Sequence, residues 1–291
     1  MKTFLPALLL IATFAQAQSN LPNTDVYLVN IELKDSVLTT KETTPISTSK
    51  LYDNQPFFSF DGYSILYSSV QEGVNPDIYL YSTQSNSGYP FFESYNESKF
   101  WPQYTADGLG YSIVNRGEDG KQMLWKYFND ARTPINVVPT VTDIGNYCWI
   151  SDEYLIYRRE LNIPTLNILN LKTGETKTIA EGVGVSLAKV PGEKSVYYIK
   201  TQQDKSYLMK YQIEENKSTE IINLFNGTED FCTTVYGDVW VIRDGSIYSY
   251  ISGSKRLIKI YTFTNDILKN TYRIALNRTL TQMAVVVKTT N

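Results

Sequence analysis

Acid–base catalysis by paired carboxylates is the catalytic chemistry that the sequence offers most directly. Glu229 and Asp230 are adjacent acidic residues, and two carboxyl groups are the minimum set for glycosidase-type catalysis. Adjacent residues of a strand point to opposite faces, so these two would not converge on one bond. The main hypothesis is therefore a non-catalytic protein. The alternative is a carboxylate-based hydrolase or lyase that acts on glycans.

Histidine is absent from all 291 residues. Histidine is the side chain that most often exchanges protons near neutrality and the commonest ligand of transition metals. Its absence excludes a Ser-His-Asp triad, a Cys-His pair and a histidine-based zinc site. The Asp-Gly pairs that begin at Asp61, Asp107, Asp119 and Asp244 lack the spacing of an EF-hand loop, and turn chemistry explains them better. We expect no metal and no cofactor.

Charge and the N-terminus indicate where the protein acts. The formal net charge is −3, so the chain has no cationic surface to neutralise nucleic-acid phosphates, and we expect no nucleic-acid partner. Residues 1–17 have the pattern of a signal peptide, with Lys2, a short apolar run and Ala15-Gln16-Ala17. The run is too short to span a bilayer. We therefore expect an exported protein, periplasmic or secreted, without a transmembrane segment, and a single domain over residues 18–291.

A repeat of hairpins runs along the whole chain. Residues 55–67 and 101–113 each contain a short aromatic strand, an Asp-Gly turn and a second alternating strand, and their aspartates Asp61 and Asp107 are 46 positions apart. This pattern is the strongest short-range signal for a hairpin. Four weaker copies follow, at residues 147–157, 187–199, 231–242 and 272–287. Third strands follow five of the six hairpins, at residues 77–81, 123–127, 165–169, 207–211 and 246–250.

The sixth repeat ends with the chain, and its missing strands are at the other end. Residues 24–31 have the composition of the third strands, and residues 36–40 can supply the fourth. Circular closure of this kind avoids an unpaired sheet edge. The sequence therefore predicts an all-β fold, a six-bladed β-propeller of four-stranded antiparallel blades whose last blade is closed by the N-terminal strand. Cys148 and Cys232 occupy equivalent places two repeats apart, too far for a disulfide, and we expect both to be free.

The repeats resemble a known family. The hairpins at residues 58–62 and 104–108, followed by Asp-Ile-Tyr-Leu-Tyr at 77–81, are similar to the PD40 repeats of TolB-like six-bladed propellers. Residues 104–127, 146–150 and 186–192 resemble a group of exported bacterial TolB-like proteins of unassigned role. The resemblance implies the propeller fold and an exported location. Cys148 and Val185 stand where that group tends to carry histidine and arginine, which puts any site built on those positions in doubt.

The channel mouth is the expected site, because the first strand of each blade lines the central channel of a propeller. The residues expected at the mouth are those at which each of these strands begins. They are Gln55, Trp101, Tyr147, Ser186, Asp230 and Tyr272, with Glu229 and Arg273 beside them. Aromatic, amide and carboxylate groups together suit a peptide or a sugar.

Two other roles remain open at this point. Trp101 and Tyr147 can instead simply pack between blades, and an outer surface can serve as a scaffold in an envelope assembly. We expect an exported, non-catalytic propeller that binds or scaffolds a protein or peptide, or a glycan, in the cell envelope.

Overall fold

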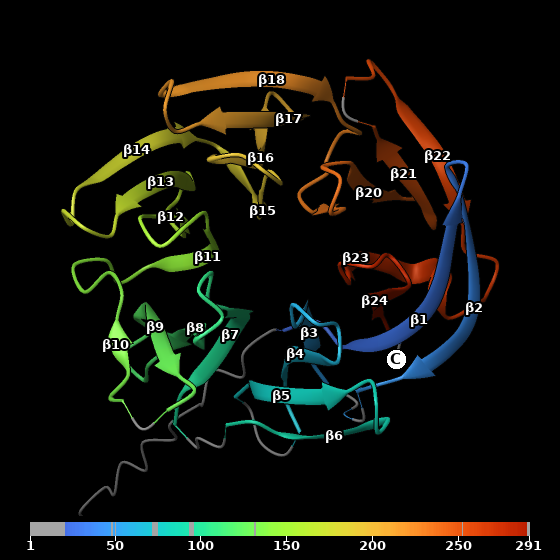
Figure 1. Ribbon diagram of the computed structural model, residues 1–291, viewed down its shortest axis with the longest axis horizontal. Coiled ribbons are helices and arrows are strands. Elements are labelled where there is room, and N and C mark those ends of the chain that lie inside the picture. Colours follow the sequence, from blue (N-terminus) through green and yellow to red (C-terminus); the bar gives the residue numbers. More distant parts are fainter. Residues whose placement is uncertain are drawn as a thin grey trace, which may run out of the picture.

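The computed structural model describes residues 21–47, 49, 51–71, 75–92, 96–130, 132–251 and 253–289. The proposed signal peptide, residues 1–17, lies outside the described residues. Six four-stranded antiparallel sheets surround a central axis like the blades of a propeller (Figure 1). Within the described residues the only helical segment is the short 3-10 turn η1 (Leu268–Asn270), and no helix there is long and apolar enough to cross a membrane. The predicted six-bladed fold is confirmed.

Five blades consist of four consecutive strands, counted from the channel outwards. Blade 1 contains β3 (Asp53–Phe58), β4 (Ser64–Ser69), β5 (Asp77–Ser82) and β6 (Ser87–Pro90). Blade 2 contains β7 (Ser98–Tyr104), β8 (Gly110–Arg116), β9 (Gln122–Phe128) and β10 (Ile135–Asn136). Blade 3 contains β11 (Ile144–Trp149), β12 (Tyr154–Arg159), β13 (Thr165–Asn170) and β14 (Thr176–Glu181). Blade 4 contains β15 (Val183–Lys189), β16 (Ser195–Gln202), β17 (Lys205–Gln212) and β18 (Lys217–Asn223). Blade 5 contains β19 (Cys232–Thr233), β20 (Val239–Arg243), β21 (Ser246–Tyr250) and β22 (Leu257–Thr262).

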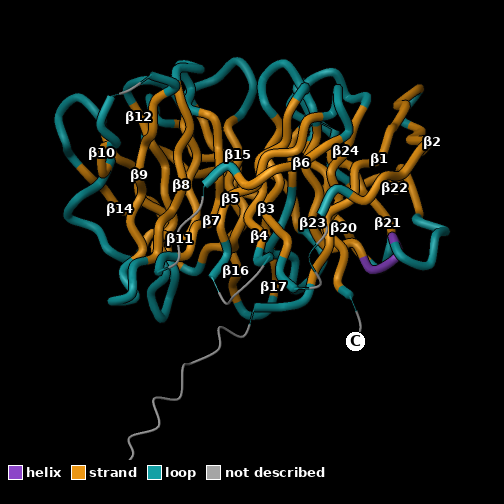
Figure 2. The backbone as a smooth tube through the Cα atoms, turned by 90° about the horizontal axis from the view of Figure 1, so that it is seen from below, coloured by secondary structure: helices purple, strands orange, loops and turns teal. Residues whose placement is uncertain are grey.

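Blade 6 joins the two ends of the chain. Its inner strands are β23 (Thr271–Leu276) and β24 (Gln282–Lys288), and its outer strands are β1 (Thr24–Lys34) and β2 (Val37–Pro45). The predicted closure is thus confirmed, with both outer strands supplied by the N-terminal segment. Leu28 pairs with Ala284, and Thr24 pairs with Lys288. The register places the beginning of β1 and the end of β24 on the same face of the ring, which we call the terminal face (Figure 2).

Asp-Gly turns connect the inner strands of blades 1 and 2 to the second strands. Asp61 Oδ1 accepts hydrogen bonds from Ser59 Oγ at 2.5 Å and from the Tyr63 amide at 2.9 Å. Gly62 has a φ of 78°, a value that glycine adopts without a steric penalty. The turn of blade 2 is built in the same way around Asp107. The turns after the six inner strands lie on the face opposite the terminal face, which we call the rim face.

Neighbouring blades pack through apolar faces. Between blades 5 and 6, for example, Trp240 and Ile247 join one buried cluster with Val285, and all three side chains are at most 1% exposed. Burial of this kind is worth about 25 cal/mol per Å² of apolar surface. The packing fixes the angle between blades and therefore the positions of the inner strands around the channel.

Candidate functional site: the central channel

A cavity of about 610 Å³ lies on the propeller axis, and all six inner-strand segments contribute to its lining. Its wall runs from the middle of these segments to the turns of the rim face, so the cavity opens toward that face. We call its deepest level the floor. Six residues form the floor, one from each blade, and they are Gln55, Trp101, Asn146, Ser186, Asp230 and Arg273.

Bulges shape the floor. The pairing of inner and second strands shifts register between Asn54 and Phe57 in blade 1 and between Phe100 and Gln103 in blade 2. Gln55 and Trp101 sit in these bulges with φ values of 59° and 53°, in a region that residues other than glycine rarely occupy. A proline follows each of them, as expected where a strand ladder is interrupted. In the bulge of blade 2, the Trp101 amide and carbonyl bond to side chains of the two neighbouring blades.

Hydrogen bonds join blades 1, 2 and 3 at the floor. The Gln55 side-chain carbonyl accepts a hydrogen bond from the Trp101 amide at 2.8 Å. The Tyr147 hydroxyl donates to the Trp101 carbonyl at 2.9 Å and is also 2.9 Å from Ser112 Oγ. Gln103 Nε2 donates to the Tyr147 carbonyl at 2.7 Å. Each blade is therefore tied to the next by polar contacts of the inner strand.

The same kind of contact continues through blades 4, 5 and 6. Asn146 Nδ2 donates to the Val185 carbonyl at 2.9 Å, and Ser186 Oγ donates to the Asp230 carboxylate. Arg273 Nε donates to the other oxygen of Asp230, while Arg273 Nη1 donates to Asn54 Oδ1 at 2.6 Å. Since Asn54 precedes Gln55, these contacts close a polar ring through all six blades. We call this ring the floor belt.

The ion pair of the floor belt is largely buried. The side chains of Arg273 and Asp230 are 13% and 17% exposed, and the Arg273 guanidinium lies 4.7 Å from the centre of the Trp101 ring. Burial lowers the pKa of Arg273, but the Asp230 carboxylate together with the nearby tyrosines Tyr272 and Tyr52 outweighs that effect and raises the pKa overall. The pair sets two opposite charges side by side, so that they cancel locally.

The structure places the eight residues expected at the channel mouth at two kinds of position. Gln55, Trp101, Ser186, Asp230 and Arg273 line the cavity, at its floor and not at its opening. The other three are absent from the lining. Tyr147 is fully buried, the Tyr272 hydroxyl accepts a hydrogen bond from Asn54 at 2.5 Å, and Glu229 has an exposed side chain.

Glu229 contributes through its backbone. Its carbonyl accepts hydrogen bonds from the amides of Val185 at 3.0 Å and Ser186 at 3.2 Å, which ties blade 4 to the segment that enters blade 5. Because its side chain is outside the cavity, Asp230 is the only carboxylate in the lining formed by the described residues. The two acids do not face a common ligand position.

Aromatic residues that the sequence analysis did not identify line the channel above the floor. Phe57 and Phe60 of blade 1 lie 6.4 and 6.3 Å from the Tyr104 ring of blade 2, measured between ring centres. Trp149 of blade 3 continues this surface. We call these four residues the aromatic wall. Their position in the repeats, just before the turns of the rim face, is the signal that could have found them.

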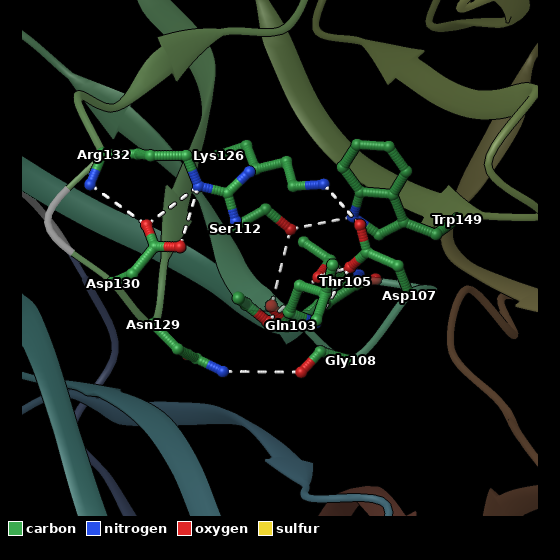
Figure 3. A network of polar contacts seen from close by, with 12 residues as sticks. Gln103, Thr105, Asp107, Gly108, Ser112, Lys126, Asn129, Asp130, Arg132 and Trp149 are labelled. Carbon is green, nitrogen blue, oxygen red and sulfur yellow. Dashed lines mark hydrogen bonds and ion pairs between the residues drawn. The ribbon is translucent and has the colours of Figure 1, made fainter.

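Trp149 is held in place by blade 2 (Figure 3). Its indole Nε1 donates to Ser112 Oγ at 2.8 Å. Lys126 lies over the indole, with Nζ 5.8 Å from the ring centre, and pairs with Asp107 at 2.8 Å. The indole is therefore presented to the channel in one orientation, which lowers the entropy cost of binding against it.

Blades 4, 5 and 6 give the channel a different surface. Lys189 and Arg278, two exposed cations, lie in its lining near the rim face, and the two free cysteines Cys148 and Cys232 lie deeper. Burial raises the pKa of Cys148 to about 12 and that of Cys232 well above its ordinary value. Both thiols therefore stay protonated. Within the described part of the chain, no three histidine, cysteine or acidic side chains gather closely enough to hold a metal ion.

Comparison with known proteins identifies the fold. No protein-family model and no curated protein matches the sequence. A TolB candidate from Agrobacterium tumefaciens is similar in structure, with a TM-score of 0.67 and 13% identity over 93% of this chain and 99% of that chain. TolB from Acinetobacter baumannii has a TM-score of 0.58 and 10% identity over 90% of this chain, which spans only 64% of that protein. A gluconolactonase from Xanthomonas campestris has a TM-score of 0.60 and 9% identity, over 81% and 86% of the two chains.

The expected TolB-like six-bladed propeller is confirmed by these structures. The same fold occurs in binding proteins and in enzymes, so the fold alone does not assign an activity. Function has to be argued from the channel.

Proposed function

We propose that this chain is an exported, non-catalytic propeller that binds a protein or peptide partner in the cell envelope through its central channel. The observation that carries the proposal is the cavity of about 610 Å³ that opens at the rim face and is lined by the aromatic wall. Ligand pockets of this size typically combine apolar and aromatic walls with a few polar groups. A glycan is the second ligand class that such a surface suits. Residues 1–17 would direct export.

The chemistry of the lining supports binding over catalysis. A two-carboxylate mechanism needs two acids that face one bond, and the described lining contains Asp230 alone, which is paired with Arg273. A tyrosine base would need a lowered pKa, whereas burial raises the pKa of Tyr272. Among the described residues, the floor therefore offers the hydrolase or lyase hypothesis no second carboxylate and no tyrosine base.

Two channel variants and one control test the proposal. Phe60→Ala removes an exposed ring from the aromatic wall, and Ala106→Trp fills the channel opening from blade 2. Tyr63→Ala is the matched control, because Tyr63 is an exposed aromatic residue of the same turn that does not line the channel. Each variant is immobilised and exposed to an extract of the native cell envelope, and the retained proteins are compared by mass spectrometry.

We expect a partner that wild type and Tyr63→Ala retain and that the two channel variants bind roughly tenfold more weakly, as for the loss of one binding hot spot. Equal retention by all four proteins would move the interface to another face and favour a scaffold. If wild type retains no protein but degrades a glycan, the enzyme hypothesis replaces the proposal.

A further inference from the structure

Charge is unevenly distributed in the channel. The charged residues of its lining are three cations, Lys189, Arg273 and Arg278, and one acid, Asp230. Asp230 and Arg273 neutralise each other at the floor. Two positive charges therefore remain near the opening, in a protein whose formal net charge is −3. A cleft with low-dielectric walls focuses such a potential onto a ligand that enters it.

The two remaining cations are available to a ligand. Neither Lys189 nor Arg278 forms a salt bridge with a described residue, and both side chains are exposed. The Arg278 guanidinium lies 5.8 Å from the centre of the Phe60 ring, a cation–π contact that places it beside the aromatic wall at the channel opening.

The rim turns also carry acids, some of which are paired with other cations. Asp61 caps its own turn, Asp107 pairs with Lys126 at 2.8 Å, and Glu193 pairs with Lys210 at 2.6 Å. None of these three acids belongs to the channel lining. Asp230 is thus the only acid of the described lining, and a ligand carboxylate would add a partner there for Lys189 and Arg278.

The opening thus has two chemically distinct sides. Aromatic residues occupy blades 1, 2 and 3, while Lys189 and Arg278 occupy blades 4 and 6. Resting on the proposed binding function, we propose that the ligand is an acidic peptide. Its carboxylate groups are bound by Lys189 and Arg278, and an apolar side chain packs against Phe60 and Trp149. Charge-assisted hydrogen bonds from the arginine supply the specificity.

Peptide libraries of matched composition test this proposal. The first library contains hexapeptides of Phe, Leu, Gly, Ser, Asp and Glu with an amidated C-terminus, and the second replaces Asp and Glu by Asn and Gln. A third library has the residues of the second with a free C-terminal carboxylate. It distinguishes binding of acidic side chains from binding of a peptide C-terminus. Retention on the immobilised protein is measured by mass spectrometry for wild type and for Lys189→Gln/Arg278→Gln.

Lys255→Gln/Arg256→Gln is the control, since these two exposed cations lie outside the channel lining and their loss changes net charge equally. We expect wild type and control to retain one of the carboxylate libraries at least tenfold better than the neutral one, and the channel variant to lose that preference. The preference should also weaken as salt concentration rises.

The outcomes separate this proposal from the function on which it rests. Equal retention of neutral and acidic peptides by wild type would overturn the charge preference and leave peptide binding intact. A preference lost equally in the control would show general electrostatics and also overturn it. If no library is retained by wild type, peptide binding itself fails. Retention of oligogalacturonate in that case would assign the cationic side to an acidic glycan.

Discussion

Arg273 of blade 6 donates hydrogen bonds to Asp230 at the beginning of blade 5 and to Asn54 in blade 1. One guanidinium thus links three of the six blades at the floor of the channel. The contact closes the floor belt at the point where the last blade of the ring meets the first. Asp230, one of the two acids that the sequence offers for catalysis, therefore joins blades through this ion pair.

Removing the guanidinium should destabilise the ring. Arg273→Met leaves the Asp230 carboxylate largely buried without its cation, and we expect the free energy of unfolding to fall by about 3 kcal/mol. Urea denaturation followed by tryptophan fluorescence measures it. The double variant Arg273→Met/Asp230→Asn should recover part of the loss, because no charge is then left unpaired. A single variant as stable as wild type would show that the pair contributes no net stability.

The repeat pattern predicted the fold because each element carries a local signal. Hairpin turns such as Asp61-Gly62 are fixed by short-range chemistry. Residues 24–31 have the composition of the third strands of the other blades, and β1 is indeed the third strand of blade 6. Closure of blade 6 followed because an unpaired edge is unfavourable.

The site was predicted less completely because bulges are not visible as a change in composition. Gln55 and Trp101 lie in bulges with positive φ, so the residues around them form the floor and bond between blades instead of surrounding an opening. Phe60, Trp149, Lys189 and Arg278 reach the channel from the other ends of the inner strands. These residues are recognised as channel walls only once the position of the cavity along the propeller axis is known.

Asp53 makes the stability of the ring depend on pH. Its carboxylate accepts hydrogen bonds from the hydroxyl groups of Ser69 and Ser49, the latter at 2.7 Å. Its backbone carbonyl accepts another from the Thr24 hydroxyl of β1. Burial raises the pKa of Asp53 to about 6, and the serine hydrogen bonds offset only part of that effect. Because the pKa is higher in the folded state, the protonated Asp53 favours folding. This contribution to the free energy of unfolding is fully present below the unfolded pKa near 4 and is lost as pH rises through about 6.

Asp53→Asn isolates this effect, because the amide cannot ionise. Relative to Asp53→Asn, wild type should gain about 1.4 kcal/mol of unfolding free energy when the pH is lowered from 7.5 to 5. Urea denaturation of both proteins at four pH values measures the difference. A difference that stays constant across this range would mean that Asp53 titrates with an ordinary pKa.

Leu28 tests how strongly the N-terminal strands close the ring. It is 5% exposed and packs in one cluster with Ala284 and Val286 of β24. Leu28→Ala should lower the free energy of unfolding by about 2–4 kcal/mol and speed amide hydrogen exchange in β24. Leu166→Ala, a truncation at a fully buried position of blade 3, is the control and should leave exchange in β24 slower than in Leu28→Ala. Equal exchange in the two variants would mean that blade 6 does not open locally.

Cys148 and Cys232 should be unreactive in the folded protein although both contribute to the channel lining. Burial raises the pKa of Cys148 to about 12, and the thiolate is the reactive form, so at pH 8 its reaction with Ellman's reagent should be roughly a thousandfold slower than that of an unperturbed thiol. Burial also raises the pKa of Cys232 well above its ordinary value, and the nearby Asp230 carboxylate adds to the effect. Both thiols should react within seconds in guanidinium chloride, which serves as the control.

Rapid reaction of one thiol in the native protein would contradict this prediction and show that the channel floor opens to solvent. The variants Cys148→Ser and Cys232→Ser would then identify which side of blade 4 moves.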